Sequence, residues 1–283
     1  MFGVIDIGSN SVRLMLQGDT KTKYVNTTGL ARGSLDGYLQ KDSINRTIDA
    51  IVEYKNLALK KGAKSLYIFA TEAVRSSKNR QDFIDLVKEK TGVNLVLIPA
   101  EREAEMGFYG AYTTGECLVI DIGGASTEIV VGNSEEIHYK KSVPIGIIRI
   151  LDNVKNGVNK QEYIQKMLKK YGDIPKADIC YAIGGTAGTI AAVNEQLEVY
   201  DINVTHNYKL SLELVDYWQK RFASLSTEEI ANLKGMDIKR AEIIEGGTNL
   251  LYEIMKMLKV DKVFVSENDN LEGFVKLYDI KEK

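Results

Sequence analysis

Two stretches of this chain, at residues 4–16 and 119–131, share one pattern of apolar and polar positions. In each, an apolar run ends in an aspartate, small and hydroxylic residues follow, and a second apolar run returns. The copies lie 115 positions apart and align without a gap. Short apolar runs separated by such residues are typical of paired strands, so each copy predicts a β-hairpin with a polar tip.

The rest of the chain alternates between apolar runs and helical spacing. The runs that predict strands lie at 23–27, 66–70, 95–98, 137–143, 179–183 and 262–266. Apolar positions recur at helical spacing at 43–61, 79–91, 99–110, 160–170, 211–222, 239–258 and 271–280. This order predicts a layered α/β protein. The length of 283 residues suits two domains, which we expect at 1–115 and 116–283, with the last helix packed back on the first.

The tips of both hairpins suit a phosphate group, because backbone N–H groups in such turns converge on one anion and hydroxyls add donors. Asp6 and Asp121 precede the turns and would repel a phosphate unless a divalent cation lay between them. Mg²⁺ (or Mn²⁺) binds through one or two carboxylates plus substrate oxygens, which makes these aspartates the predicted metal ligands. An ordinary hairpin explains one copy, but two matching copies favour phosphate binding. The predicted phosphate-binding residues are Gly8, Ser9, Asn10 and Ser11, and Gly123, Gly124, Ala125 and Ser126.

Two further places could hold an anion. Arg75 comes directly after a predicted strand, where it can face a ligand, although a solvent-exposed arginine at a helix start is an equal alternative. Gly184, Gly185 and Thr186 lie between a strand and a helix, which favours a seat for a nucleoside or a distal phosphate. Double glycines also serve close packing of a helix on a strand, so this signal is weak by itself.

Composition excludes several classes of function. The formal net charge of −2 provides no overall attraction to DNA or to anionic lipid, so a polyanionic substrate would depend on local Lys and Arg side chains. No apolar run reaches membrane-spanning length and no secretory signal is seen, so we expect a cytoplasmic protein. Cys117 and Cys180 each open an apolar run and are expected to be buried thiols. His138 and His206 stand alone, which argues against a zinc site or a Ser-His-Asp triad.

Six segments together resemble the exopolyphosphatase and guanosine pentaphosphate phosphohydrolase (Ppx/GppA) family. The segments are 6–13, 70–75, 103–104, 121–128, 144–149 and 183–186. They occur in order over nearly the whole chain, and the ordered set is more specific than any single motif. The resemblance implies the duplicated ribonuclease H-like fold of actin, Hsp70 and the acetate and sugar kinases, in which two domains close on a cleft.

The resemblance also implies a chemistry. The two Asp-bearing turns hold metal and phosphates, and a glutamate on the helix before the second turn activates water. Glu103 matches that glutamate, whereas its neighbours Glu101 and Glu105 do not. Arg75 would neutralise the transferring phosphoryl group together with the metal. The expected activity is a metal-dependent phosphoanhydride hydrolase that removes the terminal phosphate from inorganic polyphosphate or from pppGpp.

The sequence departs from the family pattern in three places. Ala125 stands where a third glycine is usual, which predicts a less close approach of phosphate there. The segment 270–273 lacks an arginine that often precedes Glu-Gly in the family. The chain also resembles a short form without the C-terminal helical domain of longer members. A homodimer would be ordinary for such a chain.

Two alternative functions stay open at this point. One is an ATP-dependent small-molecule kinase of the same superfamily, although no acceptor-binding segment is apparent. The other is a weakly catalytic regulator that binds an alarmone or nucleotide, or an actin-like polymer. The presence of both aspartate turns together with Glu103 favours turnover over either regulatory alternative.

Overall fold

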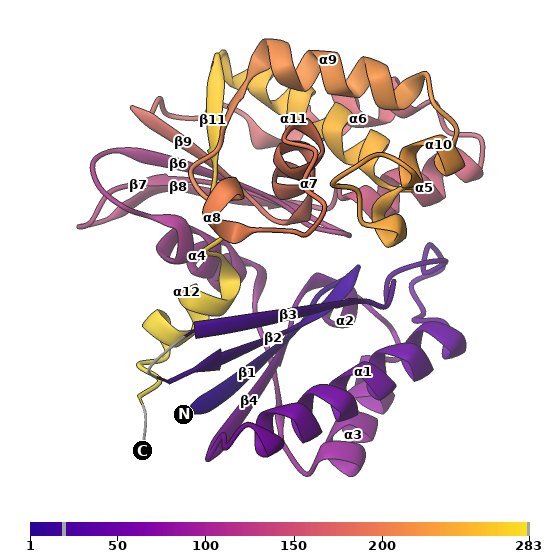
Figure 1. Cartoon of the computed structure of the whole chain (residues 1–283), viewed down its shortest axis with the longest axis vertical. Helices are drawn as coiled ribbons and strands as arrows, with labels where there is room; N and C mark the ends of the chain where they lie inside the picture. Colours follow the sequence, from indigo (N-terminus) through magenta and orange to yellow (C-terminus); the bar gives the residue numbers. More distant parts are fainter. Residues whose placement is uncertain (19–20, 282–283) are drawn as a thin grey trace.

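The computed structural model describes residues 1–18 and 21–281, which form two α/β domains, one above the other in Figure 1. The strands of the first sheet are β1 (Phe2–Ile7), β2 (Ser11–Gln17), β3 (Lys21–Thr27), β4 (Ser65–Ala70) and β5 (Leu95–Leu97). Those of the second are β6 (Cys117–Ile122), β7 (Thr127–Gly132), β8 (Ile137–Val143), β9 (Ile179–Ile183), β10 (Lys209–Ser211) and β11 (Lys262–Val265).

The two sheets repeat one topology. The first has the order β3-β2-β1-β4-β5, and the second has β8-β7-β6-β9-β11 with β10 added at its edge. In both, neighbours among the first three strands are antiparallel, and two later strands, β4 and β5 or β9 and β11, run parallel to the first. The repeat of the hairpin sequence therefore extends to the strand order of whole domains, as the predicted duplication requires.

Helices cover both faces of each sheet. The helices of the first half are α1 (Lys41–Lys60), α2 (Glu72–Arg75), α3 (Arg80–Thr91) and α4 (Ala100–Ala111). Those of the second half are α5 (Ile147–Lys155), α6 (Lys160–Leu168), η1 (Lys169–Tyr171), α7 (Gly185–Asn194), α8 (Ile202–Thr205), α9 (Leu212–Ala223), α10 (Thr227–Ala231), η2 (Ile238–Arg240), α11 (Ile244–Leu258) and α12 (Asn270–Leu277). Alternate residues of the central strands point to opposite faces, so each sheet buries two apolar surfaces.

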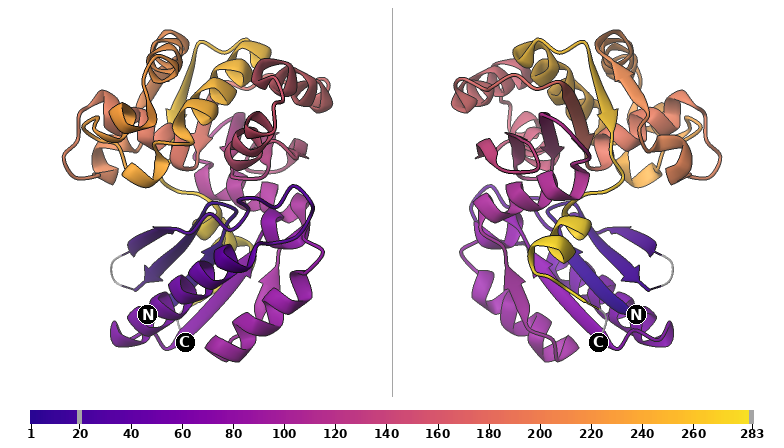
Figure 2. Two further views of the ribbon diagram at one scale, coloured as in Figure 1. Left: turned by 90° about the vertical axis from the view of Figure 1, so that its right-hand side faces the viewer. Right: turned by 90° about the vertical axis from the view of Figure 1, so that its left-hand side faces the viewer.

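Helices α4 and α12 cross between the domains and lie side by side in both views of Figure 2. Phe274 of α12 stacks on Phe69 of β4, with ring centroids 4.7 Å apart, so α12 packs on the first domain. The crossing is close because glycines face carbonyl groups: a Cβ at Gly273 would overlap the carbonyl of Met106, and one at Gly110 would overlap the carbonyl of Asp269. The residues that follow the second sheet thus join both domains.

The predicted strands and long helices are confirmed, with one change inside 239–258. That segment is η2 followed by α11, and its double glycine lies within α11. Gly247 faces Thr186 of α7 and Gly246 faces Ile150 of α5, so both glycines allow close helix packing. The short elements β10, α8 and α10 carry no clear apolar pattern and were not expected.

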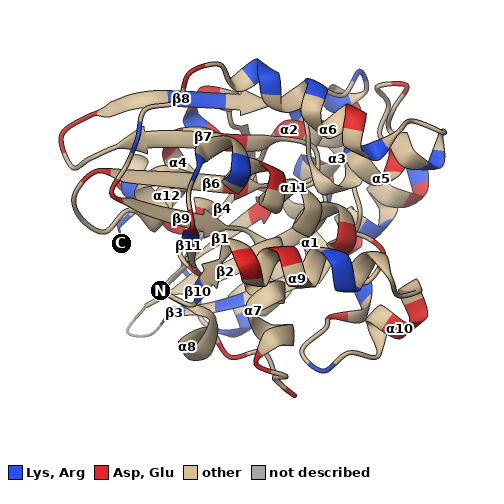
Figure 3. Cartoon of the chain, turned by 90° about the horizontal axis from the view of Figure 1, so that it is seen from above, with Lys and Arg blue, Asp and Glu red and all other residues tan. Residues whose placement is uncertain are grey.

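Seen from above, Lys and Arg are interspersed with Asp and Glu over the helices, whereas β8 carries Lys without an acidic residue (Figure 3). Within the described residues, no helix combines the length and the apolar character that crossing a membrane requires. Cys117 and Cys180 are both buried and both free, as expected from their places at the start of β6 and β9.

Candidate active site

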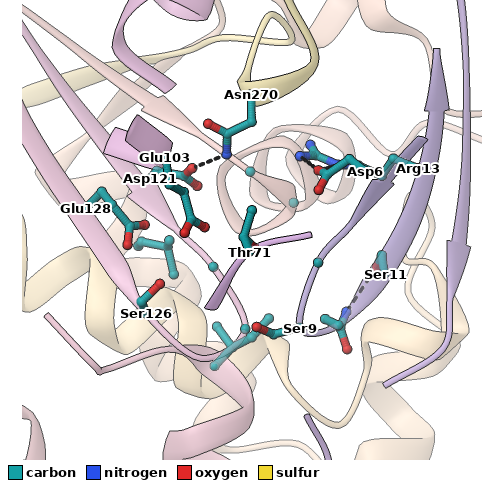
Figure 4. A pocket seen from close by; sticks show the side chains of 18 of the residues that line it. Asp6, Ser9, Ser11, Arg13, Thr71, Glu103, Asp121, Ser126, Glu128 and Asn270 are labelled. Atoms are coloured by element: carbon teal, nitrogen blue, oxygen red, sulfur yellow. Dashed lines mark hydrogen bonds and ion pairs between the residues drawn. The ribbon is translucent and has the colours of Figure 1, made fainter. Parts of the chain in front are cut away.

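A cavity of about 100 Å³ lies between the tips of the two hairpins, and Figure 4 shows side chains of both domains turned toward it. Each tip has the same backbone turn. The N–H of Gly8 donates to the carbonyl of Ser11, and the N–H of Gly123 donates to the carbonyl of Ser126, both at 3.0 Å. The two tips approach so closely that a Cβ at Gly124 would come within 2.7 Å of Ser9.

The pairing of strands gives the two aspartates different partners. Asp6 is opposite Arg13 in the first hairpin, and Asp121 is opposite Glu128 at the equivalent place in the second. The first repeat therefore presents an aspartate neutralised by a guanidinium, whereas the second presents two acids on adjacent strands. This difference makes the second hairpin the more acidic of the two.

Asp6 is held by Arg13, whose Nε and Nη2 both donate to Oδ2 of the carboxylate. The other carboxylate oxygen, Oδ1, is buried and receives no hydrogen bond from the described residues. Burial raises the pKa of Asp6, and Arg13 opposes that effect. Oδ1 is thus an orphaned acceptor at the cavity, which suits a cation.

Asp121 is 8% exposed, and its Oδ2 accepts a hydrogen bond of 2.8 Å from the amide of Asn270 on α12. Burial raises its pKa to about 6, although Arg13 and the Asn270 hydrogen bond act in the opposite direction. Glu128 is also buried, and its Oε1 accepts from Ser142 at 2.6 Å. Burial, together with the neighbouring charges of Glu103 and Asp121, raises the pKa of Glu128 well above its usual range.

Glu103 enters the cavity from the first turn of α4 and is 6% exposed. Burial raises its pKa to about 7, which suits a group that exchanges a proton near neutral pH. Arg75 lowers that pKa in part: its Nη1 donates to Oε2 of Glu103 at 2.8 Å. The same guanidinium also donates to Glu72 and to the carbonyl of Ile98, both at 2.6 Å. These bonds hold Arg75 beside the acid, and it does not line the cavity.

Arg240 of η2 also lines the cavity and lies over the start of α7. A Cβ at Gly185 would overlap its guanidinium, so the missing side chain makes room for it. That guanidinium makes no hydrogen bond or ion pair with any residue in the described part of the chain. Burial lowers the pKa of Arg240. A guanidinium at a cavity without a directly bonded partner favours an anionic ligand.

Most of the residues predicted from the sequence meet at this cavity. Those that line it are Asp6, Gly8, Ser9, Asn10, Ser11, Glu103, Asp121, Gly123, Gly124, Ser126, Gly184 and Gly185. Three do not: Arg75 binds Glu103, Thr186 packs against Gly247, and Ala125 lines a separate cavity. The methyl group of Ala125 therefore does not restrict this cavity.

The sequence reasoning gave no role to seven residues that line the cavity. They are Arg13, Thr71, Ile122, Glu128, Ile147, Arg240 and Asn270. Glu128 could have been found from the hairpin repeat. It lies seven positions after Asp121, as Arg13 lies seven positions after Asp6, and in a tight hairpin this spacing pairs the two residues. Arg240 and Asn270 had no comparable signal.

The oxygen donors at the cavity fit a magnesium or manganese ion that is bound partly by the protein and partly by a substrate. Asp6 and Asp121 supply carboxylate oxygens, which such ions prefer. Among the described residues, no three His, Cys, Asp or Glu side chains are close enough to enclose an ion by themselves. An ion here would complete its coordination with water and phosphate oxygens, the usual arrangement for Mg²⁺ at phosphate sites.

Several known proteins are similar to this chain. The sequence profile described as the Ppx/GppA phosphatase family matches residues 4–278. A bifunctional 3-dehydroquinate synthase/phosphatase from Fusobacterium nucleatum is 31% identical over 96% of this chain, which spans about half (45%) of that relative's length. Exopolyphosphatase 2 from Mycobacterium tuberculosis is 27% identical over 95% of both chains.

Solved structures show the same fold. The Aquifex aeolicus PPX-GPPA enzyme is 29% identical, covers 97% of this chain and 98% of its own, and has a TM-score of 0.77. That likeness and the repeated strand order confirm the duplicated actin-like, ribonuclease H-like fold. The chain belongs to the Ppx/GppA phosphatase family.

Proposed function

We propose that this protein is a metal-dependent phosphoanhydride hydrolase that removes the terminal phosphate from inorganic polyphosphate or from pppGpp. The observation that carries the proposal is the small cavity between two repeated phosphate-type turns, with Glu103 at its wall. A cavity of about 100 Å³ is small. It therefore favours a substrate that enters by its end, with one phosphoryl group beside an attacking water.

The charges of the cavity support a metal cofactor. Asp6, Glu103, Asp121 and Glu128 face it, against the two cations Arg13 and Arg240. A further phosphate would add negative charge to an acidic wall, and Mg²⁺ or Mn²⁺ held by the two aspartates would remove that conflict. When bound, such an ion supplies neutralisation of the phosphoryl oxygens.

Side chains of this chain can carry the rest of the reaction. Backbone N–H groups of the two turns and the guanidinium of Arg240 would orient the terminal phosphate. A water oxygen bonds to the terminal phosphorus, and the bridging P–O bond breaks with its electron pair left on the shortened chain. Glu103 takes the proton of the water, and Arg75 holds that carboxylate in place.

A second, larger cavity of about 480 Å³ offers space for the remainder of the substrate. Three cationic side chains, Arg32, Arg46 and Lys239, line it beside the single acid Glu242. Lys239 precedes Arg240 in η2, so consecutive residues face the two cavities. The net positive charge of this second cavity favours binding of the remote phosphates of an anionic chain.

The deciding experiment measures phosphate release from polyphosphate, pppGpp and ATP in parallel, with Mg²⁺, with Mn²⁺ and with EDTA. We expect release from polyphosphate or pppGpp only in the presence of metal. Asp121→Asn should require a higher concentration of metal for half-maximal rate. No release from either substrate with either metal would refute the proposed activity, and tight pppGpp binding without turnover would favour a regulator.

A further inference from the structure

Two consecutive residues at the start of α12 are linked to the aspartates of both domains, Asn270 directly and Asp269 through Arg13. Asn270 donates to Oδ2 of Asp121 at 2.8 Å. Asp269 accepts from Nη1 of Arg13, and the same guanidinium donates to Asp6. Figure 4 shows Asn270 above the cavity, with Asp121 and Arg13 on either side. One helical turn thus connects residues that belong to different sheets.

Asp269 is fixed in this position by local bonds. Its Oδ1 accepts the N–H of Leu271 at 3.0 Å, which caps the helix, and its own N–H donates to Glu272 at 2.9 Å. Lys23 of β3 donates to Glu272 at 2.8 Å and lies 3.7 Å from Asp269. Arg13 is therefore held between two carboxylates whose places are set by the first sheet and by α12.

Asn270 is fixed by packing instead. It is 6% exposed, and its Oδ1 is buried and accepts no hydrogen bond within the described residues. The amide lies against Gly107 of α4, where a Cβ would come within 3.3 Å of that oxygen and 3.6 Å of Asp121. An amide kept in a tight space despite an unsatisfied acceptor indicates that its donor to Asp121 is the functional end.

In each aspartate, one carboxylate oxygen accepts these hydrogen bonds and the other does not. Asp6 gives Oδ2 to Arg13 and keeps Oδ1 unpaired among the described residues. Asp121 gives Oδ2 to Asn270 and lines the cavity with the rest of its carboxylate. The bond of Asn270 to Asp121, and the bond of Arg13 to Asp6 that Asp269 holds in place, therefore fix which oxygen of each carboxylate is available to a ligand.

We propose that Asn270 and Asp269 are positioning residues, which set the spacing of the two aspartates so that one oxygen of each can hold a shared divalent cation. The inference rests on the proposed function for the identity of the ligand. It assigns a role to the segment 270–273, where this chain lacks the arginine that is usual in the family. Loss of a residue that bonds to a metal ligand typically lowers metal affinity 10- to 100-fold.

The test measures binding of Mn²⁺ with inorganic phosphate by EPR, in the whole protein, alongside the Mg²⁺ dependence of phosphate release. Asn270→Leu keeps nearly the same side-chain volume and adds no charge but removes the donor, and Asn270→Ala removes the amide. Asp269→Asn keeps the helix cap, since Asn caps as well as Asp does, but weakens the partner of Arg13. Asn268→Ala serves as the matched control, because Asn268 binds the exposed Lys21.

We expect the Mn²⁺ dissociation constant to rise at least tenfold in the two Asn270 variants and in Asp269→Asn, and to stay unchanged in Asn268→Ala. At saturating metal, kcat should recover to within a few-fold of the original. Unchanged Mn²⁺ affinity in a folded Asn270→Leu would overturn the inference even if the protein releases phosphate. Weakened Mn²⁺ binding without any phosphate release would support the inference and refute the proposed activity. No Mn²⁺ binding by the unsubstituted protein would overturn both.

Discussion

Replacing Glu103 by Gln should make the protein more stable and less active. The carboxyl group is 6% exposed, and burial raises its pKa from the ordinary 4.5 to about 7, even though Arg75 donates to it. Gln has nearly the same shape and carries no charge, so it resembles the protonated acid. Arg75 keeps its bond to Glu72 in the variant.

The magnitude follows from the two pKa values. An acid whose pKa is raised on folding stabilises the fold while protonated, and this contribution is lost as the pH rises from 4.5 through about 7. At about 1.4 kcal/mol per pKa unit, ionised Glu103 lowers the free energy of unfolding by about 3 kcal/mol. Glu103→Gln should recover about that amount at pH 8 and much less at pH 5.

The assay is urea unfolding at pH 5 and pH 8, with phosphate release measured on the same preparations. Because the variant has no group to take the proton of water, turnover should fall by at least tenfold, while KM stays near its original value. Glu105→Gln is the matched control on the same helix. Burial would raise the pKa of Glu105, but Lys140 and Arg102 lower it overall, so this control should lose stability at pH 8 and keep its turnover.

Two results would refute the reasoning about Glu103. Equal stability of the original protein and Glu103→Gln at pH 8 would show that the buried acid carries no electrostatic cost. Comparable turnover of the two proteins would show that another group takes the proton. Either result can occur without the other, so the stability argument and the catalytic role are tested separately.

Three other predictions concern the cavity and the helix crossing. Below pH 7, kcat/KM should fall about tenfold per pH unit as Glu103 gains a proton; a constant rate from pH 5.5 to 7 would contradict this. Arg240→Gln should raise KM by about 10- to 100-fold with little change in kcat, since a charge-assisted bond to the substrate is lost. Lys239→Gln should raise KM less. Equal KM values for Arg240→Gln and the original protein would exclude Arg240 as a phosphate ligand. Gly273→Ala should lower the free energy of unfolding by about 3 kcal/mol, because its Cβ would overlap the carbonyl of Met106; urea unfolding that shows a loss below about 1 kcal/mol would contradict the close crossing.

Much of the fold followed from local patterns in the sequence. Apolar runs and turn residues act over a few positions, so the hairpins at Asp6 and Asp121 were predictable, and their repeat implied that the two tips are equivalent. The choice of Glu103 over Glu101 and Glu105 depended on family resemblance, because all three lie near the start of one helix. The structure gives a physical reason for that choice: Glu103 lines the cavity, whereas Glu105 pairs with Lys140 and Arg102.

Only the tertiary structure decided which acidic groups the arginines and the Asn270 amide bind. Arg75 was expected to face an anion, but its bonds to Glu103 and to the carbonyl of Ile98 hold it beside the first turn of α4. Arg240 and Asn270 are far from both turns in the sequence. Arg240 reaches the cavity because η2 lies over Gly185, and Asn270 reaches it because glycines that face carbonyl groups let α12 cross close to α4. By itself the sequence determined the strands, the turns and the two aspartates, since these depend on neighbouring residues. The partners that orient those aspartates depend on contacts between distant helices, which no local pattern records.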